Sequence, residues 1–230
     1  NNIMEQVVII CKRSPNMKKF LHIFIFTILS IALFCVFASA ASWQDADGIT
    51  WSFTYSDTDM TATITSGTTP KSGTDRTHAL NIPAKVRYNS KEYTVTKIGN
   101  SAFDCGDNFT TSNALSKKYF GHVTIPDTVV EIGEYAFDSS AIFGEIVIPE
   151  SVTKIGKYAF RNCVGLDTVV FPSSFDTVPE GCFQGCKALV EFKTEGLIKS
   201  FKANAFRDCQ SLYSITISKE VVEIANNAFS

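Results

Sequence analysis

Phenylalanine recurs at a fixed interval in the second half of this chain. Five of these residues follow one another at a spacing of 23 positions: Phe137, Phe160, Phe183, Phe206 and Phe229. A constant period of about 20 to 50 residues indicates one small unit that is copied and stacked, because each copy is too small to bury its apolar face alone. The period therefore predicts a solenoid, which is expected to act through one long surface rather than a deep pocket.

Other positions keep the same phase as the phenylalanines. Val152 and Ile155 come eight and five residues before Phe160, and Ala159 directly precedes it. Downstream, a cysteine and a leucine lead into a short alternating segment, which is typical of a strand. The side chains that these strands are expected to turn inward form one pair per copy: Val123/Ile125, Ile146/Ile148, Val169/Phe171, Phe192/Thr194 and Ile215/Ile217.

The pattern Val-x-x-Ile-Gly-x-x-Ala-Phe-x-x-Cys-x-x-Leu-x-x-Ile-x-Ile-Pro is nearly complete from Val152 to Phe171. It resembles the leucine-rich repeat of the BspA-like surface proteins, and the resemblance covers about Leu80 to Ser230. It implies a mainly β repeat solenoid, a leucine-rich repeat array of about six 23-residue repeats with short helical turns. The later copies lose the glycine and then the proline of the pattern, so their turns are expected to differ: Pro179, Lys202 and Ala225, then Glu195 and Ser218.

One interval in the array is longer than the others. Phe103 precedes Phe137 by 34 residues, which predicts that 11 extra residues loop out within about 104–121. Insertions of this kind are tolerated on one side of a repeat array and often carry function. Asn108 begins an Asn-Phe-Thr sequon inside this loop, and it is a candidate glycosylation site if the host is a eukaryote.

The segment ahead of the repeats has a different character. Alternating residues at Gly48–Tyr55 and Met60–Ile64 flank the polar turn Ser56–Asp59, which predicts a β-hairpin. We expect residues 41–79 to form a β N-terminal cap that covers the apolar end of the first repeat, with the solenoid at 80–230.

A leader segment is predicted at the N-terminus. The apolar run 20–37 follows the basic Met17–Lys19 and ends in Ala38–Ala40, which predicts a signal peptide at 17–40 that is cleaved before Ala41. A retained membrane anchor is the alternative, because the run just reaches bilayer-spanning length. Residues 1–16 are interpreted as over-extended translation, and no membrane span is predicted in the mature chain.

The other terminus stops one residue after Phe229, and no capping segment follows the last repeat. This predicts that the chain is a fragment of a longer gene product. An uncapped repeat exposes apolar surface, so self-association through the C-terminal repeat is also expected.

Composition argues against several function classes. Without residues 1–40 the chain keeps 17 of 21 basic and 22 of 23 acidic residues, a net charge of −5, which does not attract nucleic acid. Only His78 and His122 remain for metal binding or nucleophile activation, and no hydrolase, phosphate-loop or metalloprotease motif occurs. We predict no enzyme activity, no catalytic residues, no metal site and no cofactor.

Five cysteines remain after the predicted cleavage: Cys105, Cys163, Cys182, Cys186 and Cys209. Three of them are in phase with the repeat and are expected to stack as a buried thiol column in the turns. An odd count in a secreted chain also allows disulfides with one free thiol, and a metal site is a third interpretation.

The residues that flank the inward pairs must face outward, because side chains alternate along a strand. They form the candidate ligand-binding strand face: His122, Thr124, Glu145, Val147, Thr168, Val170, Glu191, Lys193, Ser214 and Thr216. The strip is polar with mixed charge, which suits an extracellular protein or glycan, and a merely soluble sheet face is the alternative.

The resemblance implies a secreted or cell-surface protein that acts as a protein-binding adhesin towards host cells, extracellular matrix or other microbes. The alternative is a structural cell-envelope component that self-assembles through stacked repeats. Light scattering that rises with concentration would favour this second function.

Overall fold

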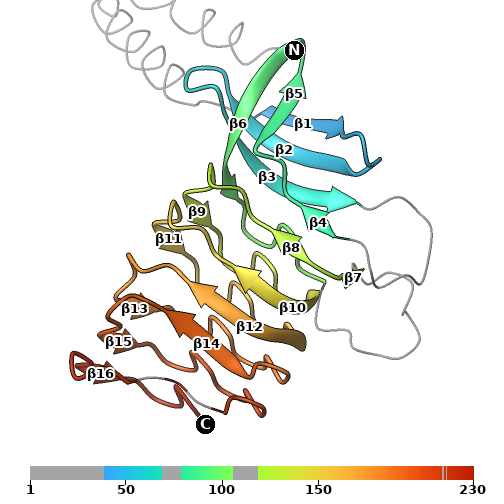
Figure 1. The fold of residues 1–230 in the computed structure, drawn as a ribbon. Coiled ribbons are helices and arrows are strands. Elements are labelled where there is room, and N and C mark those ends of the chain that lie inside the picture. Colours follow the sequence, from blue (N-terminus) through green and yellow to red (C-terminus); the bar gives the residue numbers. More distant parts are fainter. Residues whose placement is uncertain (1–38, 69–78, 106–118, 214, 216) are drawn as a thin grey trace, which may run out of the picture. The chain divides into compact units, whose positions relative to one another are not determined.

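The computed structural model describes residues 39–68, 79–105, 119–213, 215 and 217–230 (Figure 1). The predicted over-extension, nearly all of the signal peptide, most of the inserted loop with Asn108, and the face positions Ser214 and Thr216 lie outside these residues. None of the described segments forms a helix that is long and apolar enough to cross a membrane.

The segment predicted as the N-terminal cap forms a small antiparallel sheet. Its strands β1 (Ser39–Gln44), β2 (Thr50–Ser56) and β3 (Thr61–Thr68) pair in sequence order, with β2 and β3 forming a hairpin. Trp51 and Phe53 alternate with solvent-facing residues along β2 and are fully buried. Strand β1 was not expected. It begins at Ser39, whose backbone pairs with Tyr55, so cleavage before Ala41 would shorten this strand.

A second hairpin links the cap to the repeats. Strands β5 (Lys85–Tyr88) and β6 (Lys91–Ile98) are joined by Asn89 and Ser90, which both have positive φ, as a tight two-residue hairpin turn requires. Strand β6 pairs in parallel with β3 on one side and with the first short repeat strand, β9 (Glu131–Ile132), on the other. The N-terminal sheet therefore continues the backbone ladder of the array, and its Trp51 ring lies 6.4 Å from the Phe103 ring, centroid to centroid.

The longer strands of the repeats face the viewer in Figure 1. β7 (Tyr119–Phe120), β10 (Ala141–Val147), β12 (Gly165–Phe171) and β14 (Glu191–Thr194) form one sheet, which we call the long-strand sheet. β4 (Leu80–Asn81) and β8 (Val123–Thr124) pair with each other beside it. Their pairings are all parallel, and Glu145 aligns with Thr168 and then with Glu191. Residues that are 23 positions apart in the sequence are therefore neighbours on adjacent strands.

The expected inward side chains are buried in the first repeats, including Val123, Ile146 and Val169. The last pair departs from the expectation, because Ile215 is only half-buried and Ile217 is 46 % exposed. These two residues belong to the final repeat, where the described residues provide no further strand to cover them.

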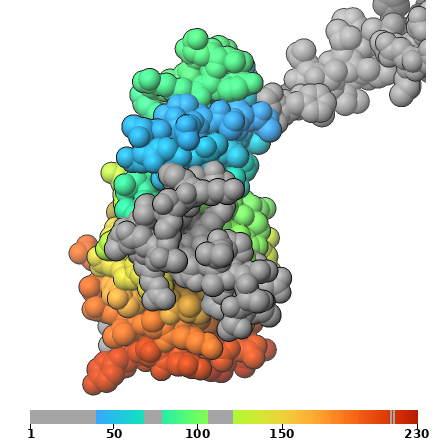
Figure 2. Space-filling model, turned by 90° about the vertical axis from the view of Figure 1, so that its right-hand side faces the viewer, coloured from blue at the N-terminus to red at the C-terminus, as the bar shows by residue number. Residues whose placement is uncertain are grey.

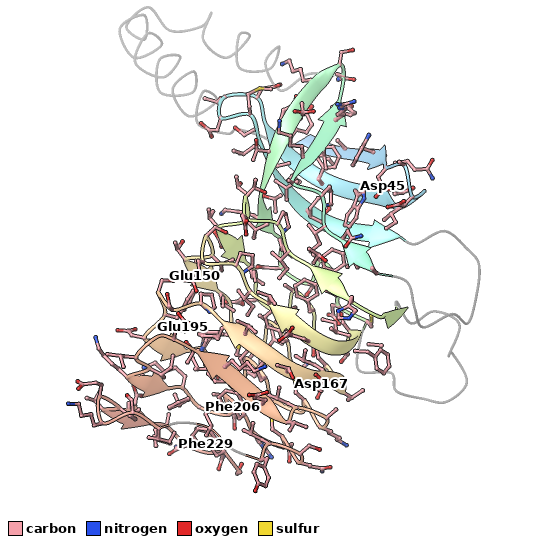
Figure 3. The ribbon with its side chains drawn as sticks, viewed as in Figure 1. Asp45, Glu150, Asp167, Glu195, Phe206 and Phe229 are labelled. Atoms are coloured by element: carbon pink, nitrogen blue, oxygen red, sulfur yellow. The ribbon has the colours of Figure 1, made fainter. Side chains whose placement is uncertain are left out.

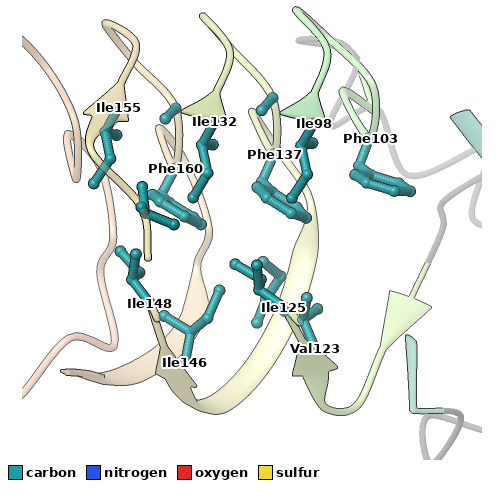
Figure 4. Packing of buried hydrophobic residues seen from close by; sticks show 14 of the residues in the cluster. Ile98, Phe103, Val123, Ile125, Ile132, Phe137, Ile146, Ile148, Ile155 and Phe160 are labelled. Atoms are coloured by element: carbon teal, nitrogen blue, oxygen red, sulfur yellow. The ribbon is translucent and has the colours of Figure 1, made fainter. Parts of the chain in front are cut away.

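The phenylalanines form one continuous stack through the core. Successive ring centroids from Phe103 to Phe229 lie 5.1 to 5.6 Å apart, and the ring planes are within 18° of parallel. Figure 4 shows the first three rings in a row between the isoleucines of the short strands and the inward residues of the long strands. Stacked and offset aromatic pairs add about 0.5–1.5 kcal/mol beyond their buried area, so the stack ties each repeat to the next.

The turn before each phenylalanine needs a left-handed residue. The residue two positions earlier has a φ between 52° and 60° in every repeat: Ser101, Tyr135, Tyr158, Gly181, Asn204 and Asn227. Glycine and asparagine adopt this region at little cost, whereas tyrosine does so rarely. The turn also directs the phenylalanine N–H to a carbonyl of the next repeat, as from Phe137 to Ala159 at 2.7 Å.

A second ladder of short strands runs along another side of the solenoid. It contains β9, β11 (Lys154–Ile155), β13 (Thr177–Val178), β15 (Ser200–Phe201) and β16 (Glu223–Ile224). In most repeats the residue at the glycine position donates its N–H to the preceding repeat, for example Gly156 to the Ile132 carbonyl at 2.8 Å. Proline has no N–H, so Pro179 cannot make this bond. The ladder is accordingly split into β6–β9–β11 and β13–β15–β16.

Seen from the side, the repeats succeed one another from yellow through orange to red, as expected for units stacked in sequence order, whereas at the other end the green β5–β6 hairpin lies beyond the blue β1 (Figure 2). The long-strand sheet remains continuous from β10 to β14, past the position of Pro179. The two parts of the short-strand ladder are therefore held together by this sheet, by the phenylalanine stack and by hydrogen bonds between the turns, such as Tyr158 N–H to the Glu180 carbonyl at 2.9 Å.

Candidate functional site

The long-strand sheet, together with β8 beside it, presents the side chains that the alternation predicted as outward. We define the strand face as the eight described members of that set: His122, Thr124, Glu145, Val147, Thr168, Val170, Glu191 and Lys193. Six of them are exposed, and Thr168 and Val170 are half-buried. They form two columns, because Glu145, Thr168 and Glu191 are neighbours across the strands, as are Val147, Val170 and Lys193.

The charges on the strand face interact across the repeats. Lys193 Nζ lies 3.2 Å from Glu191 Oε2 and 3.9 Å from Glu145 Oε1. All three side chains are about half exposed, so solvent screens these pairs and each contributes about 0–1 kcal/mol to stability. The lysine nevertheless spans two repeats and places its cation between two carboxylates.

The amino end of the strand face contains His122 and a local irregularity. Gly144 has a φ of +78°, and the register between β10 and β12 shifts directly after it. A Cβ atom at this glycine would lie 3.7 Å from His122 Cε1, so the imidazole lies in ordinary contact distance of the strand. The shift leaves Asp167 as the unpaired residue of a bulge.

An open groove of about 590 Å³ lies at the other end of the strand face. Phe171 and Phe192 contribute apolar surface to it, next to Val170 and Lys193 of the face. Glu150 and Glu195 also line the groove, together with Glu191. Alternation along the strands does not predict these two residues, because they lie just beyond the strands, at or next to the position of the repeat proline. Charged residues at the strand ends of the sequence would have indicated them.

Glu150 has a structural role in this groove. Its carboxylate accepts hydrogen bonds from the backbone N–H and the hydroxyl of Ser173, one repeat further on, at 2.9 Å each. These bonds hold the pKa of Glu150 below its usual range, mainly through the backbone N–H. The residue therefore stays charged at neutral pH and connects two successive turns.

The three in-phase cysteines form the column that the spacing predicted. Cys163, Cys186 and Cys209 each donate from Sγ to the phenylalanine carbonyl of the preceding repeat, at 3.1 to 3.2 Å. Ser140 takes the same position in the repeat that lacks a cysteine, and its hydroxyl donates to the Phe103 carbonyl at 2.5 Å. The column therefore needs a small hydrogen-bond donor rather than a thiol as such.

All five cysteines are free thiols, and burial raises the pKa of both Cys182 and Cys186. These thiols are accordingly poor nucleophiles, since the thiolate is the reactive form. Within the described ranges, no group of three or more His, Cys, Asp or Glu side chains is arranged to hold a metal ion.

One buried polar cluster was missed by the sequence analysis. Arg161 forms an ion pair with Asp138, whose side chain is 3 % exposed, and the guanidinium lies 5.1 Å from the centroid of the Tyr135 ring. Tyr135 stacks on Tyr158 at 5.1 Å, and Tyr158 donates its hydroxyl to Glu180. Asp138 and Arg161 are 23 residues apart, so comparing the columns for opposite charges would have revealed the pair.

The chain was compared with known proteins. A family model described as the BspA type leucine rich repeat region matches residues 108–230 in six copies. A comparison with curated protein sequences found no match.

Several solved structures share the fold. A leucine rich cell surface protein from Faecalibacterium prausnitzii is 29 % identical, with a TM-score of 0.54, over 84 % of this chain and 52 % of that one. A leucine-rich repeat protein from Eubacterium ventriosum is 22 % identical, with a TM-score of 0.55, over 82 % and 49 %. The pneumococcal vaccine antigen PcpA is 17 % identical, with a TM-score of 0.54, over 82 % and 47 %.

This chain thus spans about half the length of these three structures. The matched residues include β8, β10, β12 and β14, which carry the strand face, and they make up more than half of the sequence. The chain belongs to the BspA-type leucine-rich repeat family.

Proposed function

We propose that this protein is exported and acts at the cell surface as an adhesin that binds an extracellular protein through the strand face. The observation that carries the proposal is the array of outward side chains on β10, β12 and β14, which the parallel pairings hold in register, with His122 and Thr124 exposed at β8. Parallel strands fix the spacing of these side chains, so little conformational entropy is lost when a partner binds. Binding surfaces of repeat proteins are extended in the same way.

Export is supported by two features. The predicted signal peptide at 17–40 would direct the chain out of the cytoplasm. The F. prausnitzii structure, which is 29 % identical to this chain over the aligned residues, is that of a cell surface protein. Host cells, extracellular matrix and other microbes are the partners that we propose for the adhesin.

Simultaneous replacement of Glu145, Thr168, Glu191 and Lys193 by alanine tests the proposal. We expect this variant to lose binding to host cells and matrix proteins while its thermal unfolding stays close to that of the native chain, since all four residues lie at the surface. A matched control carries alanine at Glu134, Thr153, Lys199 and Glu223, which have the same composition and are exposed elsewhere. Unchanged binding by the first variant would exclude the strand face.

A self-assembling envelope component is the second proposal, and the surface of the last repeat favours it. Val222 is 84 % exposed and Ile224 is 54 % exposed, and an open pocket of about 430 Å³ lies between Phe206, Leu212 and Phe229. Light scattering over a range of protein concentrations distinguishes the two functions. Growth in particle mass that Ile224→Asp abolishes would support assembly, whereas a constant monomer mass would reject it.

A further inference from the structure

The charges are distributed differently on the two ladders of the solenoid. Along the short strands, most acidic residues have a lysine partner in the same or the neighbouring repeat. Glu131 lies 2.7 Å from Lys97 and 2.8 Å from Lys154, and similar pairs join Lys157 to Glu180, Lys199 to Asp176 and Lys202 to Glu223. Five lysines on that side of the molecule therefore neutralise four carboxylates.

The strand face does not neutralise its charge. Lys193 is the one ion-pair partner that Glu145 and Glu191 have among the described residues. Asp167 lies at the amino end of β12, and Glu150 and Glu195 lie beyond the carboxyl ends of β10 and β14 (Figure 3). Among the described residues, neither Asp167 nor Glu195 has a cationic side chain within ion-pair distance. Carboxylates in excess of cations thus stand in the middle and at both ends of the face.

The apolar part of the face lies directly beside these carboxylates. Val147 is 51 % exposed, its neighbour Val170 is half-buried, and the groove next to Val170 includes Phe171 and Phe192. Lysine and arginine can satisfy both kinds of surface, because their aliphatic stems pack on apolar groups while their charged heads reach a carboxylate. Lys193 has this arrangement within the chain, since it is the neighbour of Val170 across the strands and its Nζ lies 3.9 Å from Glu145 Oε1 and 3.2 Å from Glu191 Oε2.

We propose that the strand face binds a lysine- or arginine-rich extended segment of its extracellular partner, and that Lys193 competes for the same carboxylates in the free protein. This inference rests on the adhesin function proposed above and specifies the chemistry of the partner. Complementary charge also speeds association and disfavours partners of the wrong sign. A sulfated or otherwise anionic glycan is therefore disfavoured at this face.

The test uses the purified chain and fluorescein-labelled probes in anisotropy titrations. The first probe is a short peptide of alternating lysine and valine, the second has glutamate in place of lysine, and the third is a heparin fragment. We expect only the lysine peptide to bind, and its affinity to fall as NaCl screens the contacts. We expect Glu145→Gln with Glu191→Gln to weaken binding about 10-fold, because each exposed ion pair contributes modestly.

The Lys193→Gln variant gives the most specific result. Removal of the internal competitor is expected to tighten binding of the lysine peptide about 3-fold, although the protein loses a long side chain from its contact surface. The matched control, Glu134→Gln with Glu220→Gln, makes the same change in net charge outside the face and should leave the affinity within about 2-fold. Equal weakening by the control pair, or tighter binding of the heparin fragment, would overturn the proposal.

The two proposals fail in different ways. If the quadruple alanine variant no longer binds host cells while Glu145→Gln with Glu191→Gln binds them normally, the adhesin function stands and the basic partner is wrong. If the quadruple variant still binds host cells as the native chain does, the strand face is not the adhesive surface and this inference loses its basis.

Discussion

The two parts of the short-strand ladder, β6–β9–β11 and β13–β15–β16, have the same period but differ in how closely successive repeats approach each other. In the first part, Gly133 and Gly156 lie so close to the preceding repeat that an added Cβ would come within 2.6 Å of its backbone. In the second part, Lys202 and Ala225 occupy the same position and still donate their N–H groups, at 3.1 and 2.9 Å. The hydrogen bond therefore requires an N–H group, whereas the close approach of the first part requires glycine.

Pro179 lies at the boundary between these two arrangements, because proline lacks the N–H group of the second part and carries the Cβ atom that the glycines of the first part lack. Without its N–H, the carbonyl of Ile155 does not receive the bond that the corresponding carbonyls receive in other repeats. Across this boundary the repeats keep the β12–β14 pairing, the Phe160–Phe183 stack, whose centroids are 5.6 Å apart, and hydrogen bonds between their turns, such as that from the Phe160 N–H to the Cys182 carbonyl at 3.0 Å. Substitutions on either side of Pro179 should show whether the solenoid unfolds as one unit or as two.

The largest effect is expected from Phe160→Ala. This ring is fully buried and stacks on Phe137 and Phe183, so its loss should lower the free energy of unfolding by about 3–5 kcal/mol. Because the stack is one of the contacts that couple the two parts of the ladder across the boundary, its loss should weaken this coupling, and we also expect chemical denaturation to separate into two transitions. Phe229→Ala is the control. Its ring is 38 % exposed, and a loss of about 1–2 kcal/mol with a single transition is expected.

Gly156→Ala should have the next largest effect. The added methyl group would collide with backbone atoms of Gly133 and Glu134, which cannot move independently, and the expected loss is about 1–3 kcal/mol in urea unfolding. The reverse change, Ala225→Gly, should cost only about 0.5–1 kcal/mol, through backbone entropy. Similar losses for both variants would show that the two parts of the ladder do not differ in how closely their repeats approach.

A smaller effect is expected from Pro179→Ala. The new N–H can donate to the Ile155 carbonyl, which would add about 0.5–1.5 kcal/mol, while the loss of proline rigidity costs about 0.4–1 kcal/mol in the unfolded chain. Net stability should therefore change little. The informative measurement is hydrogen exchange, in which the amides of Thr177 and Val178 should exchange more slowly and the new amide should be protected. Rapid exchange of the new amide would mean that something other than the missing N–H interrupts the ladder.

Features that recur in every repeat were predicted from the sequence, whereas contacts between unlike residues of successive repeats were not. Period and alternation were sufficient for the outward positions of the strand face and for the cysteine column, because the first follows from the alternation along each strand and the second from one residue type at a constant spacing. Strand β1 was missed because the signal-peptide interpretation covered Ser39 and Ala40. The Asp138–Arg161 pair was missed because its two residues have unlike chemistry in equivalent positions. Pro179 was noted as a departure, but its effect depends on the ladder geometry, which the sequence does not contain.

The smallest effect concerns the charges of the first part of the ladder. Hydrogen bonds from Lys154 and then Lys97 hold the pKa of Glu131 below its usual range. A carboxylate with a depressed folded-state pKa stabilises the fold above its unfolded-state pKa, and this stabilisation is lost as the pH falls through the folded-state value. The Glu131 side chain is 23 % exposed, so we expect a contribution of about 1 kcal/mol or less.

Glu131→Gln should therefore lower the free energy of unfolding at neutral pH and leave it nearly unchanged in strong acid at about pH 2, where the native carboxyl is also protonated. Urea unfolding at both pH values measures this difference. Glu223→Gln provides the comparison in the second part of the ladder. Lys202 lowers the pKa of Glu223 as well, but that side chain is 45 % exposed, so solvent screens its ion pair more strongly and a smaller pH-dependent difference is expected.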